Sequence, residues 1–212
     1  PGEPVHEEKI TFRDLSEYEN VDFQGFRGDI YVKEAIIPEG ASVIPKSQFF
    51  ECRSLEKVYL PESVSGIEDY AFADCHVLKV WESMEKLSLK SVGISAFENC
   101  YALEFVSLPD SLTVIGGAAF AECVSVNKLI FSDTSLLKKI GDHAFRGCRN
   151  LKEVYLPDSV EYVGISAFRD CSSLEQISVS EKIKNQPGIA ELEKNCPNAR
   201  IRFREVNSVE KE

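Results

Sequence analysis

The even spacing of seven cysteines constrains this chain more than any other feature of its sequence. Successive cysteines are alternately 23 and 25 residues apart, and each of the first six follows a phenylalanine by three residues. The pairs are Phe49/Cys52, Phe72/Cys75, Phe97/Cys100, Phe120/Cys123, Phe145/Cys148 and Phe168/Cys171, and Cys196 ends the series. Self-similarity with a period of about 20 to 50 residues is typical of solenoids, in which each repeat is one coil stacked on the next. The sequence therefore predicts a solenoid.

Each repeat contains a short stretch with the alternation of a half-buried β-strand. In the coil that begins at Leu151, Val154 and Leu156 alternate with polar or exposed positions, and Pro157 then ends the strand in a turn. An Ala-Phe segment leads on to Cys171, and we expect about one turn of α- or 3-10 helix there. One strand per coil, always in the same direction, predicts a parallel sheet on one side and stacked Ala-Phe segments on the other.

The repeat resembles the leucine-rich repeats of the BspA type, which also occur in treponemal surface proteins. The stretch from Leu103 to Cys123 follows that family's pattern, L-x-x-V-x-L-P-x-S-V-x-x-I-G-x-x-A-F-x-x-C, almost position by position. The resemblance implies an α/β leucine-rich repeat solenoid that is right-handed, with a parallel sheet on the concave face and short helical or 3-10 turns on the convex face. We expect residues 1–33 to form an N-terminal cap, 34–196 the solenoid, and 197–212 a C-terminal capping strand and tail.

The cysteines are explained by their repeat position, without redox chemistry. An odd number cannot all pair within the chain, and no C-x-x-C spacing occurs. Cysteine is small and is often fully buried. We therefore expect Cys52 through Cys171 to be buried free thiols and the phenylalanine column to be core. Cys196 lies in a coil that departs from the pattern, since Leu192-Glu193 replaces Ala-Phe there.

Charge and missing motifs exclude several classes of function. Lys and Arg number 24 against 35 Asp and Glu, a net charge of −11, which argues against nucleic acid or an anionic membrane as partner. The repeated turn acids Glu62, Asp110 and Asp158 are about 10 Å apart at two coils' separation, too far to share one calcium ion. No nucleophile elbow, P-loop or H-E-x-x-H motif is present. We expect no enzymatic activity, no metal and no cofactor.

Strand residues that point away from the core form the candidate partner-binding site. If Val58, Val106 and Val154 point inward, their neighbours face outward and form a row across the concave sheet. The row comprises Lys57, Tyr59, Val80, Glu82, Phe105, Ser107, Lys128, Ile130, Glu153 and Tyr155. Exposed aromatic and apolar side chains are typical of interaction surfaces, but the same residue types also stabilise strand pairing. Both interpretations stay open.

The leading hypothesis is a non-catalytic binding module. By resemblance to BspA-like proteins, we expect a secreted or cell-surface bacterial adhesion protein that binds a protein or glycan on its concave sheet face. The ligand would come from host extracellular matrix or another cell surface. The alternative is a structural, scaffolding or self-associating domain, such as a homodimer, with no extracellular ligand. We expect neither a leader nor a membrane span within this chain, because no charged-then-apolar stretch opens it and no run of about 18 apolar residues occurs.

Overall fold

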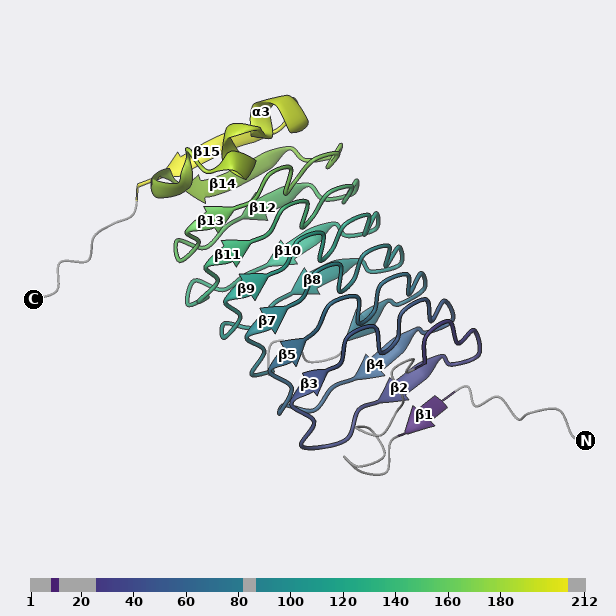
Figure 1. Cartoon of the computed structure of the whole chain (residues 1–212). Coiled ribbons are helices and arrows are strands. Elements are labelled where there is room, and N and C mark those ends of the chain that lie inside the picture. The colour runs from purple at the N-terminus through teal and green to yellow at the C-terminus, as the bar shows by residue number, and fades with distance from the viewer. Residues whose placement is uncertain (1–8, 12–25, 82–86, 206–212) are drawn as a thin grey trace, which may run out of the picture.

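The chain winds into a stack of coils that runs from the N-terminal to the C-terminal end of the molecule (Figure 1). The computed structural model describes residues 9–11, 26–81 and 87–205. Every strand pair among these residues is parallel. The prediction of a parallel solenoid is confirmed.

The longer strands of the coils lie on one side of the molecule, which we call the long-strand face. They form two sheets, in the orders β1-β2-β4-β6 and β8-β10-β12-β14-β15. The first contains β1 (Lys9–Thr11), β2 (Glu34–Ile36), β4 (Lys57–Tyr59) and β6 (Val80–Trp81). The second contains β8 (Phe105–Ser107), β10 (Lys128–Ile130), β12 (Glu153–Tyr155), β14 (Gln176–Ser180) and β15 (Arg200–Arg204). Among the described residues, no strand pairing joins β6 to β8, so the long-strand face consists of two sheets.

Two-residue strands form a second side, the short-strand face. They are β3 (Val43–Ile44), β5 (Gly66–Ile67), β7 (Ser91–Val92), β9 (Val114–Ile115), β11 (Lys139–Ile140) and β13 (Tyr162–Val163). These six strands pair in that order in one sheet. The short-strand face therefore continues past the point where the long-strand face divides.

The Ala-Phe segments form the third side of each coil, and here the structure differs from the expected helical turn. In the repeat that contains Phe97, the N–H groups of Ser95, Phe97 and Asn99 donate to carbonyls of the next coil at 2.8, 2.8 and 2.9 Å. Ser95 and Asn99 have φ of 51° and 62°, which interrupts a right-handed helical path. The segment is a series of tight turns because its N–H groups serve the neighbouring coil.

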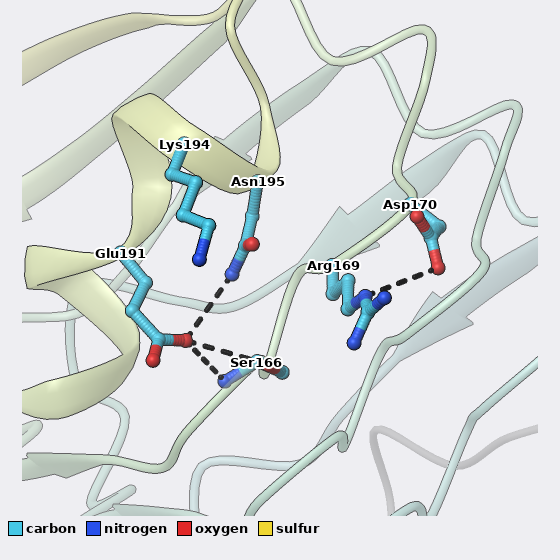
Figure 2. Close-up of a pocket in the computed structure, with 6 residues that line it drawn as sticks. All are labelled: Ser166, Arg169, Asp170, Glu191, Lys194 and Asn195. Carbon is cyan, nitrogen blue, oxygen red and sulfur yellow. Dashed lines mark hydrogen bonds and ion pairs between the residues drawn. The ribbon is translucent and has the colours of Figure 1, made fainter.

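Helices occur instead at the C-terminal end, among the residues that the structure describes. They are the 3-10 helix η2 (Glu181–Ile183) and the short helices α2 (Pro187–Ala190) and α3 (Leu192–Asn195). In the coil before them, the N–H of Ser166 donates to Glu191 Oε2 at 3.1 Å (Figure 2). The equivalent N–H of His143 donates to the carbonyl of Ile165. The carboxylate of Glu191 thus replaces a carbonyl of the next coil.

The core is a column of stacked phenylalanine rings beside a column of thiols. The six predicted phenylalanines are at most 1% exposed, and their ring centroids lie 5.2 to 5.5 Å apart. Phe26, inside the segment expected as the N-terminal cap, extends the column, with its centroid 5.7 Å from that of Phe49. Each cysteine donates its S–H to the carbonyl of the phenylalanine one coil earlier, at 2.9 to 3.3 Å.

The cysteines are buried and free, as predicted, and Cys196 joins the same ladder. Burial raises the pKa of the Cys52 thiol to about 12 and that of Cys196 to about 11. A thiol reacts as its thiolate. The ladder therefore holds its cysteines in the unreactive form.

Candidate binding face

The predicted residues lie on the long-strand face, between strand positions that point into the core. Val58, Val106 and Val154 are at most 2% exposed. On either side of them, Lys57, Phe105, Lys128, Ile130, Glu153 and Tyr155 are exposed, and Tyr59 and Ser107 are half-buried. Val80 belongs to β6, and Glu82 lies outside the described residues.

The strand register groups these residues into two sets. In the sheet from β8 to β15, Lys128 pairs with both Phe105 and Glu153, so these three side chains form one column across the strands. Ser107, Ile130 and Tyr155 occupy the other outward position of the same strands. Lys57 and Tyr59 belong to the other sheet, where they pair with Glu34 and Ile36. The expected single row is therefore divided where the sheet is divided.

A hollow of about 630 Å³ lies over β10, β12 and β14 on the long-strand face. It is lined by Lys128, Glu153 and Tyr155 of the predicted set, together with Asn127, Leu129, Lys152, Val154, Glu175, Gln176 and Ser178. Its lining charges balance, with two lysines and two glutamates. Its volume falls within the range of about 300–1,000 Å³ that is usual for ligand sites. The predicted residues nearest the C-terminus thus surround a concave surface with many hydrogen-bonding groups.

At each end of the long-strand face, a cation from a terminal strand lies over a tyrosine of the predicted set. The guanidinium of Arg204 in β15 is 3.8 Å from the ring centroid of Tyr155. It also donates to Ser178 Oγ at 2.8 Å and to Asp158 Oδ1 at 2.7 Å. At the other end, Lys9 Nζ in β1 lies 5.9 Å from the ring centroid of Tyr59. These are cation–π contacts, and they leave Phe105 and Ile130 as the apolar centre of the face.

A second hollow, of about 420 Å³, lies where the last repeat meets the C-terminal helices (Figure 2). Glu191 accepts hydrogen bonds there from Ser166 and from Asn195 Nδ2, and Arg169 Nε lies 3.5 Å from Asp170 Oδ2. Glu191 and Asp170, the two acidic residues that line this hollow, therefore both have partners within the protein. We interpret the hollow as part of the C-terminal cap.

Comparison with known proteins establishes the family. A model described as a BspA type leucine rich repeat region, with six copies, matches residues 19–134 and 90–196. The chain belongs to the BspA-type leucine-rich repeat family. A search of curated proteins finds no significant match.

Solved structures of leucine-rich repeat proteins are similar to this BspA-type chain. A Bacteroides ovatus protein has a TM-score of 0.58 at 22% identity, over 87% of this chain and 63% of that one. A Treponema pallidum leucine rich repeat protein has 0.51 at 24%, over 83% and 74%. The pneumococcal vaccine antigen PcpA has 0.53 at 28%, over 72% and 37%. The chain thus spans less than two thirds of the Bacteroides protein.

Two further findings concern metal ions and membranes. Within the ranges that the structure describes, no three His, Cys, Asp or Glu side chains are grouped so that they could hold a metal ion. In the same residues, no helix has the length and apolar character needed to cross a membrane.

Sequence reasoning missed Lys9, Arg204 and the hollow over β10 to β14. Lys9 and Arg204 come from terminal strands outside the repeats, so periodicity carries no information about them. The sequence holds one weak indication of the arginine contact. Arginine alternates with other residues at 200, 202 and 204 in β15, which places basic side chains on one face of that strand.

Proposed function

We propose that this BspA-type repeat protein is a non-catalytic adhesion module of a secreted or cell-surface bacterial protein. It binds a protein partner on the long-strand face between β8 and β14. The observation that carries the proposal is the exposed apolar centre formed by Phe105 and Ile130, which are 42% and 38% exposed, beside the hollow at Tyr155. Large apolar side chains at the centre of a patch with a polar rim are the usual energetic core of an interface.

Several observations support this proposal. The rim carries Lys128, Glu153 and Gln176, which can orient a partner without a strong preference for one sign of charge. For location, the resemblance to BspA-like surface proteins supports a place outside the cell. The description of pneumococcal PcpA, a vaccine antigen, is in keeping with it. A glycan is the second class of partner that such a polar hollow would suit.

The test compares three exposed positions on the proposed face with three matched positions elsewhere. Phe105, Ile130 and Tyr155 are replaced together by Ser. The control replaces Ile94, Leu136 and Ile165 together by Ser. These side chains are 50%, 52% and 47% exposed and lie off that face. Both variants and the original protein are measured by surface plasmon resonance against immobilised extracellular-matrix proteins and by binding to a glycan array, with circular dichroism as the check on folding.

The proposal expects a partner bound by the original protein and the control, and lost by the triple variant. A partner bound with full affinity by the folded triple variant would contradict it. Self-association is the competing function, because neighbouring Lys128 and Glu153 offer a two-fold copy complementary charges. Size-exclusion chromatography with light scattering would then give a dimer that the triple variant dissociates.

A further inference from the structure

On the short-strand face, a carboxylate of one coil accepts an N–H of the next coil at two places. Asp69 Oδ1 accepts the N–H of Ile94 at 2.7 Å, and Asp142 Oδ1 accepts the N–H of Ile165 at 2.9 Å. Both aspartates stand two residues after the end of a short strand, β5 and β11 respectively. This repeat position is thus suited to a carboxylate that serves the following coil.

The two coils between them have no carboxylate at this position. Ile94 and Gly117 stand there instead, after β7 and β9. By the same spacing, a carboxylate at position 94 would accept the N–H of Gly117, and one at position 117 would accept the N–H of Asp142. Neither N–H group has an acceptor in the part of the chain that the structure describes. A Cβ added to Gly117 would meet only the carbonyl oxygen of Asp142, at 3.4 Å. Open space therefore lies beside Gly117, where an aspartate side chain would otherwise reach.

This space is part of a hollow of about 490 Å³ on the short-strand face. Ile94, which is 50% exposed, and Val114 supply apolar walls. Lys139 also lines the hollow and supplies a positive charge, with its Nζ 5.6 Å from the ring centroid of Tyr162. The hollow therefore combines two backbone donors, a cation and an apolar wall. The carboxylates of Asp69 and Asp142, which accept the N–H groups of Ile94 and Ile165, also line it.

We propose that this hollow binds an aspartate or glutamate side chain from an extended segment of a partner protein, with an adjacent apolar side chain packed on Ile94. A carboxylate forms strong, charge-assisted hydrogen bonds with backbone N–H groups. Neighbouring coils are about 4.8 Å apart, so a carboxylate placed between them lies near the N–H groups of both Gly117 and Asp142. Lys139 is the one basic residue of the lining, and the two lining aspartates are already hydrogen-bonded to the coils that follow them. This site is on a different face from the proposed adhesion surface, so either proposal can fail without the other.

The test uses the full chain, labelled with nitrogen-15, and a capped tripeptide with aspartate between two valines as the probe. The amide resonances of Gly117 and Asp142 are followed during titration by two-dimensional NMR. We expect both resonances to shift saturably, with a dissociation constant in the millimolar range. The same peptide with asparagine in place of aspartate should bind about tenfold more weakly, because it lacks the charge.

Two variants and a control make the test specific. Gly117→Asp should abolish the response, because its own carboxylate reaches the N–H of Asp142 as Asp142 reaches Ile165. Lys139→Gln should weaken binding about threefold, and Lys128→Gln, on the long-strand face, should leave it unchanged. The proposal is overturned if the two resonances do not respond, if both peptides bind equally, or if folded Gly117→Asp still responds. Should Gly117→Asp fail to fold, the two peptides and Lys139→Gln still decide.

Discussion

Each phenylalanine of the core column contacts the rings of two neighbouring coils. Phe120 is fully buried, and its ring centroid is 5.2 Å from that of Phe97 and 5.4 Å from that of Phe145. Replacing Phe120 by Ala removes a ring from a packed interior and leaves a cavity. We expect a loss of about 3–5 kcal/mol in the free energy of unfolding, measured by urea denaturation. Phe105→Ala, on the exposed face, is the matched control and should cost far less. A loss below about 1 kcal/mol for Phe120→Ala would contradict the packing of the column.

Among the elements, the C-terminal helices end the stack by supplying an acceptor in place of a further coil. Replacing Glu191 by Ala removes the acceptor from the N–H of Ser166, and an N–H left unpaired in a partly buried site costs about 1–3 kcal/mol. Glu191→Gln keeps a side-chain oxygen and should cost clearly less. Thermal unfolding of both variants measures the difference, with the exposed Glu193→Ala as control. Equal melting temperatures for Glu191→Ala and Glu193→Ala would show that Glu191 does not cap the stack.

The repeated strands and core positions were predictable from sequence, whereas the repeated tight turns and the elements that occur once were not. The strand around Val106 and the burial of Cys123 follow from positions that recur in coil after coil, so six copies reinforce one interpretation. The tight turns at Ser95 and Asn99 were missed because their N–H groups are satisfied by the next coil, a long-range effect that local pattern does not contain. The contact between Arg204 and Tyr155 depends on how one terminal strand pairs with β14, which occurs once.

At the scale of the whole molecule, the thiol ladder links folding stability to alkaline pH. Burial raises the pKa of the Cys52 thiol from its ordinary 9.0 to about 12 and that of Cys196 to about 11. Because the folded state holds the neutral thiol, this contribution is fully present below pH 9. As the pH rises from 9 towards the folded-state pKa of each thiol, this contribution is lost by about 1.4 kcal/mol per pH unit for each thiol.

Urea unfolding at a series of pH values above 9 measures this loss. The variant Cys123→Ala, which removes one titrating thiol from the unfolded chain, should show a shallower decline of stability with pH than the original protein. A control variant at an exposed site, Ser172→Ala, should leave the slope unchanged. Identical slopes for Cys123→Ala and the original protein would contradict the link between the ladder and alkaline stability.

The thiol ladder also has a practical consequence for labelling this protein. All seven cysteines lie inside the stack with their S–H groups donated to carbonyls, so a maleimide dye finds no exposed thiolate on the native fold. A cysteine introduced at a surface position such as Ser172 is then the one thiol open to the dye. A fluorophore or spin label can be attached at a chosen coil without replacing any natural cysteine.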